Sequence, residues 1–377
     1  MANTPIATGI IGLGRSGWGI HADVISRLPD RFQVAAVYDP INERAGEAAE
    51  KLSCTACASL EALLDRSDIE LVVVASPNRF HATQAIQALE AGKHVLCEKP
   101  FGFTTADVDA MTAAAKRSGV VLQPFQQRRF EPDFQKVKEI CDSGRLGRIT
   151  FVRICWHGFG RRWDWQTSRA FGGGQLYNNG PHLIDHAVEL FGPADPRVAC
   201  KLQRSLASGD AEDELIVTLT GPESPTVTVE LLATAAFPHD RWLVCGTAGS
   251  LRGTGARLEW KWVDWSGMPE RPQDLNPTPD RSYNRESLEW QEDAWEADSG
   301  ADGGAGAPPA WRPAAELYTD LWGAIREGRP QRITPEQVRR RVAVLQRCYE
   351  INDIPFPEGA RLNGQRLREA QPAEKDY

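Results

Sequence analysis

The first third of the chain alternates short apolar runs with longer stretches of helical length. The apolar runs are Ala7–Gly12, Val34–Tyr38, Leu71–Ala75, His94–Cys97 and Val120–Gln123. The stretches between them are Gly17–Leu28, Asn42–Leu52, His81–Glu90 and Thr105–Ser118. Apolar strands that alternate with helices are typical of a parallel sheet covered on both faces. Residues 1–125 are therefore predicted to form an α/β domain with a doubly wound parallel sheet.

The pattern changes after Arg128, where strand-like runs follow one another with short turns. These runs are Arg148–Trp156, Arg197–Leu206, Glu214–Leu219, Thr226–Leu232 and Arg241–Cys245. The helix-like stretches are Asp133–Ser143, Pro181–Leu190, Pro313–Glu327 and Pro335–Asn352. We predict that residues 126–377 form an α+β domain with a large open, mainly antiparallel sheet, interrupted by a loop-like insertion at 266–313. Trp260 and Trp262 alternate on one face of a strand, where we expect sheet packing.

Charge and composition narrow the class of protein. The chain of 377 residues has 43 basic and 51 acidic side chains, so its net charge is −8. Without a basic block or a long apolar run, neither a nucleic-acid partner nor a membrane is expected, and the expected location is cytoplasmic. The pair Cys54 and Cys57 has no second pair nearby, so we expect reduced thiols and no metal.

The chemistry begins with a glycine motif. Gly12-Leu-Gly14-Arg-Ser-Gly17 follows the first apolar run and opens a helix, which is the position of a dinucleotide-binding turn in a Rossmann domain. The phosphates would then lie at the helix N-terminus. Asp39 ends the second strand about 20 residues further on, where an acid accepts hydrogen bonds from the adenosine ribose. Because its carboxylate would repel a 2′-phosphate, the sequence favours NAD over NADP.

Three further segments are candidates for ligand binding. The first two lie at the ends of predicted strands of the first domain, where open α/β sheets bind ligands, and the third lies in the second part of the chain. They are Ala75-Ser-Pro-Asn78-Arg-Phe-His81, Lys93-His94-Val-Leu-Cys-Glu98-Lys99-Pro100, and Gly172-Gly-Gly174-Gln-Leu-Tyr177-Asn178-Asn179-Gly180-Pro-His182-Leu-Ile-Asp185. With the glycine turn, they resemble the Gfo/Idh/MocA oxidoreductases from Ile6 to about Leu251 and again at Leu317–Tyr349. This resemblance implies a site between a Rossmann domain and an open-sheet domain, and a homodimer or homotetramer joined through that sheet.

The resemblance also implies roles for single residues. Lys99 aligns with the lysine that contacts the reacting hydroxyl, His182 with the catalytic histidine, and Asp185 with a substrate-binding residue. Asn178 stands where the family commonly has aspartate, which weakens the standard proton relay. Pro100 is hypothesised to follow a cis peptide bond that aims Lys99.

The full set of expected site residues follows from the motif and the resemblance together. The catalytic residues are Lys99, His182, Asn178 and Asp185. The cofactor is expected to contact Gly12, Gly14, Arg15, Ser16, Gly17, Asp39, Ser76, Pro77, Asn78, His81, Glu98, Lys99, Gln127, Trp165 and Gln166. The substrate is expected to contact Lys99, Arg128, Trp163, Tyr177, Asn178, His182 and Asp185.

We therefore expect an NAD-dependent dehydrogenase that acts on a secondary hydroxyl or ketone of a sugar, sugar derivative or cyclitol. Two alternatives remain. One is a glycosidase-type enzyme that uses NAD for a transient oxidation, and the other is a sensor that binds dinucleotide without turnover. The partner in each case is a small carbohydrate or polyol.

Overall fold

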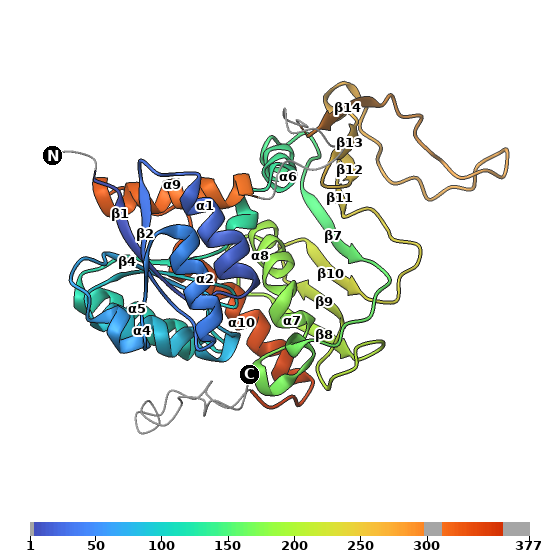
Figure 1. Cartoon of the computed structure of the whole chain (residues 1–377). Coiled ribbons are helices and arrows are strands. Elements are labelled where there is room, and N and C mark those ends of the chain that lie inside the picture. The colour runs from blue at the N-terminus through green and yellow to red at the C-terminus, as the bar shows by residue number, and fades with distance from the viewer. Residues whose placement is uncertain (1–3, 298–310, 357–377) are drawn as a thin grey trace.

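The computed structural model describes residues 4–297 and 311–356, and it contains two sheets with helices between and around them (Figure 1). The first sheet is parallel and has the strand order β3-β2-β1-β4-β5-β6. Its strands are β1 (Ile6–Ile11), β2 (Phe32–Tyr38), β3 (Thr55–Ala56), β4 (Leu71–Val74), β5 (His94–Cys97) and β6 (Leu122–Pro124). This sheet confirms the predicted doubly wound α/β domain.

The helices of this first part follow the predicted alternation closely. They are α1 (Asp23–Ser26), α2 (Asn42–Leu52), α3 (Leu60–Leu64), α4 (His81–Glu90) and α5 (Thr105–Ser118). The predicted helix Gly17–Leu28 is wrong in type at its start, because Gly17–Ala22 makes π-helical hydrogen bonds. This wider turn carries the buried His21, whose ring nitrogens lie near Tyr318 and Glu98.

The second sheet has eight strands in the order β14-β13-β12-β11-β7-β10-β9-β8. These are β7 (Ile149–His157), β8 (Arg197–Gln203), β9 (Glu214–Thr220), β10 (Thr226–Leu232), β11 (Trp242–Gly246), β12 (Gly249–Gly253), β13 (Arg257–Trp262) and β14 (Gln291–Glu296). Neighbours pair antiparallel except β7 with β10, which run parallel. The predicted open, mainly antiparallel sheet is confirmed.

Helices cover one face of this sheet. The remaining helices are α6 (Pro132–Asp142), α7 (Gln175–Asn178), α8 (Gly180–Phe191), α9 (Trp311–Glu327) and α10 (Pro335–Ile351). Helix α8 lies between the two sheets, and among residues 4–297 and 311–356 no helix covers the opposite face of the second sheet (Figure 1). Val152 and Ile154 of β7 point into the second core, as does the buried Trp260, which confirms the expected sheet packing of that tryptophan.

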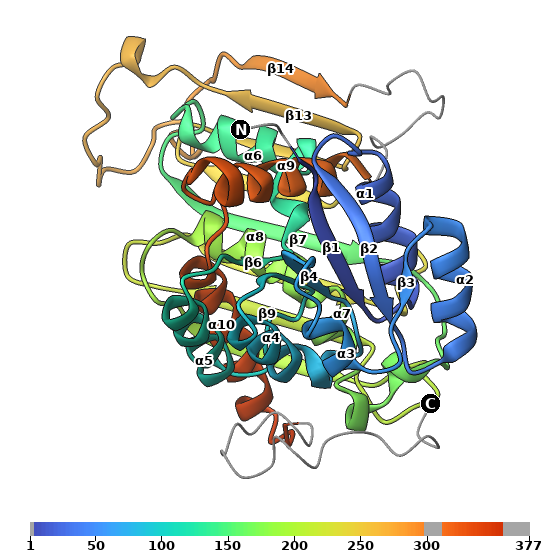
Figure 2. The ribbon, with the colours of Figure 1, turned by 60° about the vertical axis from the view of Figure 1, so that its left-hand side comes forward.

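The protein has two apolar cores, and helix α9 belongs to the core of the first sheet although it follows the second sheet in sequence. Leu317, Tyr318 and Leu321 of α9 pack into this core (Figure 2). Helix α10 contributes to both cores, through Val338 to the first and Leu345 to the second. A single cut after residue 125 therefore does not separate the two cores.

The predicted loop-like insertion at 266–313 is wrong in two places. Residues 291–296 form β14, which pairs with β13 because its alternating side chains extend the sheet edge, and α9 begins at Trp311. Residues 298–310 lie outside the described residues. Between β13 and β14 the chain makes the long projection seen at the upper right of Figure 1. Among the helices of residues 4–297 and 311–356, none has both the length and the apolar character to span a bilayer.

Because α9 packs into the first core, shortening one of its buried side chains should lower the free energy of unfolding. Leu321→Ala removes a fully buried side chain of the first core, so we expect the free energy of unfolding to fall by about 2–5 kcal/mol. The matched control is Ile351→Ala at the end of α10, where the side chain is more than a third exposed. Urea titrations followed by tryptophan fluorescence would give both values, and equal losses would contradict the assignment of α9 to the first core.

Candidate active site

The glycine turn has the geometry that a dinucleotide requires. A Cβ on Gly17 would lie 1.8 Å from the carbonyl oxygen of Gly12, so only glycine allows this close packing of helix and strand. A Cβ on Gly14 would meet no atom within 4 Å, so this turn leaves room for a phosphate group to approach the backbone. Arg15 is exposed and Ser16 half-buried beside it. These residues fit the phosphates of a nicotinamide dinucleotide.

Asp39 is held by the same turn. Its Oδ2 accepts a hydrogen bond from the Leu13 amide at 2.6 Å, and its Oδ1 accepts one from the Ile41 amide at 2.9 Å. Each carboxylate oxygen has two lone pairs, so one acceptor position on each remains for a ribose hydroxyl. The carboxylate thus ties the end of β2 to the glycine turn and remains able to bind ribose.

The segment after β4 is fixed from within the protein. The ring nitrogens of the buried His81 lie 2.9 Å from the carbonyl oxygen of Pro100 and 2.8 Å from that of Ser76. The Ser76 hydroxyl donates to Gln84 at 2.6 Å, and the Asn78 amide donates to the carbonyl of Gly172 at 2.8 Å. The expected cofactor contact of His81 is therefore corrected, because its ring joins the ends of β4 and β5.

Glu98 and Lys99 end β5. Glu98 is buried, with Oε1 3.3 Å from His21 Nε2 and Oε2 accepting the Lys99 amide at 2.9 Å. Burial raises the pKa of Glu98, but His21 outweighs this effect and brings the pKa down to about 2. Both oxygens of Glu98 bind protein groups, and its expected cofactor contact stays a prediction. The Lys99–Pro100 bond is cis, which confirms that hypothesis.

Lys99 reaches across from the first sheet to the second part of the chain. Its Nζ donates to the carbonyl oxygen of Asn178 at 3.0 Å and lies 3.4 Å from Asn178 Oδ1. Burial lowers the pKa of the ammonium below its usual value of 10.5, and the positive charge of Arg128 lowers it further. An amine with a lowered pKa can exchange a proton nearer to neutral pH. Asn178 therefore acts on Lys99 and has no recorded contact with His182.

His182 is oriented by two residues that the sequence analysis did not select. Arg341 Nη1 donates to Gln126 Oε1 at 2.6 Å, which turns the amide nitrogen of Gln126 toward Pro181 and His182. That nitrogen lies 3.5 Å from His182 Nδ1. Because an amide NH₂ only donates, Nδ1 must be the acceptor, and the proton of the neutral ring lies on Nε2. Burial, with the charges of Arg128 and Lys99, holds the His182 pKa well below 6.5.

Asp185 and Tyr177 lie in the interior of the protein, and their expected substrate contacts stay predictions. Asp185 is fully buried, and its two oxygens accept from Arg129 Nε at 2.6 Å and Nη2 at 2.9 Å. Tyr177 is fully buried in the second core, with its hydroxyl 3.5 Å from the carbonyl of Phe103. Both side chains therefore hold the fold around the site.

The remaining expected residues are half-buried or exposed. The Cζ atom of Arg128 lies 4.7 Å from the centre of the Trp156 ring, and the guanidinium pairs with Glu131. The Arg128 side chain is partly exposed. Trp163 is 78% exposed and Trp165 42%, so neither is a core residue. The nitrogen of Gly174 donates to the carbonyl of Gln166 at 2.7 Å. The sequence predictions for Arg128, Trp163, Trp165, Gln127, Gln166 and Pro77 stay predictions.

The buried Glu212 carboxylate packs against Gly174, in the glycine-rich segment that begins at Gly172. A Cβ on Gly174 would lie 2.1 Å from Glu212 Oε1, and this oxygen accepts the Leu176 amide at 3.1 Å. The carboxylate therefore fixes the start of α7, whose last residue is Asn178. Burial raises the pKa of Glu212 to about 7, although backbone amides donate to it.

Sequence reasoning missed Gln126, Arg341 and Glu212. One signal was available for Arg341: it occupies the core-facing stripe of α10, between Val338 and Leu345, where an arginine is rare. Gln126 adjoins the selected Gln127 and has no distinguishing pattern. Glu212 lies in an acidic run, Glu212-Asp213-Glu214, which reads from sequence as a solvated turn. Only the fold brings each of them to its partner.

Comparison with protein families matches both parts of the chain. A model described as the oxidoreductase family, NAD-binding Rossmann fold, of the GFO_IDH_MocA group matches residues 6–126. The model of the GFO/IDH/MocA C-terminal domain matches residues 134–252.

Three curated relatives illustrate the range of similar proteins. The chain is 35% identical over 218 residues to an uncharacterised oxidoreductase of Schizosaccharomyces pombe, covering 55% of this chain and 58% of the relative. It is 28% identical over 252 residues to the 2,7-anhydro-N-acetylneuraminate hydratase of Escherichia coli, covering 65% and 66%. It is 29% identical over 189 residues to the scyllo-inositol 2-dehydrogenase (NADP(+)) of Bacillus subtilis, covering 50% and 52%. The chain spans about three fifths of the length of the first curated relatives it matches.

Solved structures share the fold over nearly the whole chain. An NAD-binding protein from Listeria innocua superposes with a TM-score of 0.75 at 24% identity, covering 96% of this chain and 100% of that one. The WlbA dehydrogenase from Bordetella pertussis, in complex with NADH and UDP-GlcNAcA, gives 0.70 at 22% identity, covering 94% and 97%. At these identities the likeness shows the fold.

The contacts of Gln126 predict which nitrogen of His182 carries the proton. In ¹⁵N-histidine-labelled protein, we expect the His182 signals of an unprotonated Nδ1 and a protonated Nε2, assigned by their loss in His182→Gln. Gln126→Glu places an acceptor beside Nδ1, so the proton should move to Nδ1 and the pKa of His182 should rise.

Gln337→Glu is the matched control for that experiment. Gln337 also binds an arginine through its side-chain oxygen, Arg129 Nη1 at 2.9 Å, and has no recorded contact with His182. The control should leave the His182 spectrum unchanged. A protonated Nδ1 in the unaltered protein would contradict the assigned orientation.

The buried carboxyl of Glu212 predicts a dependence of stability on pH. The folded protein holds this proton up to about pH 7, whereas the unfolded chain releases it near the ordinary pKa of 4.5. The free energy of unfolding should therefore fall as the pH rises through this window. Glu212→Gln keeps the acceptor for Leu176 and should be more stable at pH 8 by roughly 1–3 kcal/mol. Denaturant titrations at several pH values test this, with the exposed Glu43→Gln as control; parallel pH profiles for all three proteins would refute it.

Proposed function

This chain belongs to the Gfo/Idh/MocA oxidoreductase family, and we propose that it is an NAD-dependent dehydrogenase of a sugar, a sugar derivative or a cyclitol. The substrate would be a secondary hydroxyl or the corresponding ketone. The observation that carries the proposal is the position of Lys99, which follows β5 of the dinucleotide-binding sheet and whose Nζ donates to Asn178, four residues before His182. Burial lowers the pKa of this amine. The names of two relatives, an inositol dehydrogenase and an anhydroneuraminate hydratase, support the substrate class.

The chain's own groups divide the work of binding and proton transfer. A nicotinamide dinucleotide bound at the glycine turn supplies the hydride acceptor or donor. Asn178 accepts two contacts from the Lys99 ammonium, which leaves one N–H for the substrate oxygen. In oxidation, the neutral amine of Lys99 takes the hydroxyl proton; in reduction, the ammonium returns it to the carbonyl oxygen.

His182 has a different task from the one that its place in the family suggests. With the proton on Nε2 and Nδ1 facing Gln126, the neutral ring donates a hydrogen bond to the substrate oxygen. A ring with a strongly lowered pKa is a poor base near neutral pH. We therefore assign proton exchange to Lys99 and orientation of the substrate oxygen to His182.

A second reaction class is favoured by one relative. The Escherichia coli relative is named a hydratase, and a hydration has no net change of oxidation state. A reaction of this kind on a carbohydrate, with the nicotinamide returned to its starting state, is the alternative to net dehydrogenation. Accumulation of reduced cofactor during turnover distinguishes the two.

The uncovered face of the second sheet supports a further proposal, that copies of the chain associate there as a homodimer or homotetramer. Ile216 on β9 is 45% exposed on this face, and the neighbouring side chains of β7 and β10 have no helix above them. We also propose a cytoplasmic location and a small carbohydrate or polyol as the partner of the site.

Lys99 is the residue whose replacement tests the proposed chemistry. The test begins with NAD and NADP against a panel of sugars, inositols and sugar acids. For any substrate found, Lys99→Arg keeps the charge but cannot lose its proton, so we expect kcat to fall by about 10²–10⁴-fold with cofactor binding retained.

The direction of the pH effect follows from the need for a neutral amine. The oxidation rate should rise with pH toward a pKa below 10.5, and the reduction rate should fall over the same range. Lys138→Arg, on the surface of α6, is the control. Full activity in Lys99→Arg would exclude Lys99 as the proton-exchanging group, and a panel with no turnover and no NAD binding would refute the dehydrogenase.

The cofactor preference follows from Asp39. The carboxylate at the end of β2 should repel a 2′-phosphate, so we expect NADH to bind at least tenfold more tightly than NADPH. Fluorescence titration of the reduced cofactors measures both dissociation constants. Tighter binding of NADPH than of NADH would overturn this prediction. One relative is named for NADP(+), so the measurement decides between two cofactors that the family contains.

A further inference from the structure

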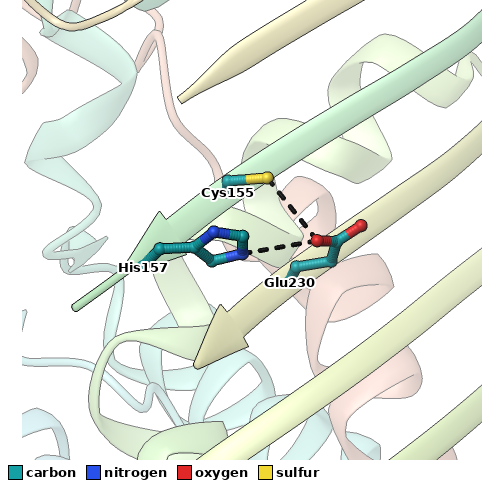
Figure 3. Close-up of side chains that lie close together, drawn as sticks. All are labelled: Cys155, His157 and Glu230. Carbon is teal, nitrogen blue, oxygen red and sulfur yellow. Dashed lines mark hydrogen bonds and ion pairs between the residues drawn. The ribbon is translucent and has the colours of Figure 1, made fainter. Parts of the chain in front are cut away.

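A second group of reactive side chains lies on the uncovered face of the second sheet. Cys155 and His157 extend from β7, and Glu230 extends from β10 directly opposite Cys155 (Figure 3). Trp156, between the two β7 residues, packs against the core, so the cluster is on the other face of the strand. Within the described residues, no other group of three or more such side chains has this spacing.

The spacing of the three side chains matches a metal ion with four ligands. His157 Nε2 lies 3.3 Å and Cys155 Sγ 3.8 Å from the same oxygen, Glu230 Oε2. All three ligand atoms lie within 4.8 Å of one another. A tetrahedral zinc ion would separate nitrogen from oxygen by roughly 3.4 Å and sulfur from oxygen by roughly 3.6 Å. The side chains therefore need to move by only a few tenths of an ångström along these two edges.

One atom of the cluster has no hydrogen bond. His157 Nε2 is buried, its side chain is 2% exposed, and it lies 3.3 Å from Glu230 Oε2 without the alignment of a hydrogen bond. A buried polar atom in this state is costly. The Glu230 side chain is 24% exposed, so an ion and a water ligand can enter from that side. A cation among the three groups would give Nε2 a partner.

The ligand types select the class of ion. A thiolate, an imidazole and a carboxylate suit zinc and similar first-row ions, whereas calcium and magnesium require oxygen ligands throughout.

Binding also requires a local rearrangement of the turn after β10. His157 Nδ1 now accepts the backbone amide of His239 at 3.3 Å, which favours the proton on Nε2. Ligation by Nε2 needs the other tautomer, so this amide must turn away. The turn is exposed, and the His239 ring lies 5.6 Å from the His157 ring, where it is available as a fourth ligand in place of water.

We propose that Cys155, His157 and Glu230 form a zinc-type metal site that joins β7 to β10. These two strands are the parallel pair in the described part of an otherwise antiparallel sheet, so the ion would fasten this pair at the carboxyl ends of both strands. The site lies on the opposite side of the sheet from α8 and does not depend on the proposed dehydrogenase. With the His239 ring as a fourth ligand the site would be closed, which is the arrangement of a structural zinc ion.

Cobalt(II) tests the site through a direct signature of the thiolate. The full chain is treated with chelator, freed of it and titrated with Co²⁺, with equivalents counted per chain in whatever assembly forms. We expect one equivalent to produce a thiolate-to-cobalt charge-transfer band and the strong visible bands of four-coordinate cobalt. Zinc should abolish both by displacement and should raise the Tm of the protein.

Matched variants separate this site from other thiols. Cys155→Ser should remove the charge-transfer band, while Cys245→Ser, a half-buried cysteine on the neighbouring strand β11, should keep it. His157→Gln and Glu230→Gln should each weaken Zn²⁺ at least tenfold, and circular dichroism verifies that every variant is folded. Absence of the band in the unaltered protein, or its persistence in folded Cys155→Ser, would overturn the proposal. If Cys155→Ser does not fold, unchanged zinc affinity in His157→Gln overturns it equally.

Discussion

The hydrogen bond from Lys99 Nζ to the carbonyl oxygen of Asn178 is the contact on which the candidate site depends. It joins the residues after β5 in the first sheet to the end of α7 in the second part of the chain, across two cores that pack separately. The contact holds the Lys99 amine in position. Burial lowers the pKa of this amine below its usual value. Each supporting interaction around it serves to hold one of these two ends.

The first end is held by buried polar groups of the Rossmann domain. Glu98 fixes the Lys99 amide, and His21 in the π-helical turn fixes Glu98 in its ionised form. His81 ties the residue after β4 to Pro100. Such a network stabilises one geometry because a buried polar atom that loses its partner is costly. This network fixes the position of the Lys99 backbone at the end of β5.

The second end is held from the second domain and from the closing helix. Glu212 fixes the start of α7, and Arg129 neutralises the buried Asp185 in α8. Arg341 of α10 sets the orientation of Gln126, which in turn orients His182. The amide of Gln126, at the end of the Rossmann domain, thus orients His182 in this chain. The site combines a neutral hydrogen-bond donor with a lysine of adjustable charge.

The sequence by itself determined the fold class and the cofactor turn, because both depend on local patterns. Apolar runs of strand length and helical spacing fix the two kinds of sheet, and the close packing that demands Gly17 is written into one short motif. Lys99 and His182 could be selected for the same reason. Tertiary structure alone decided their partners. Gln126 and Arg341 are 215 positions apart in the sequence, and Asp185 and Arg129 are 56 positions apart. A local sequence pattern therefore does not show whether Asp185 forms a buried ion pair or binds a substrate.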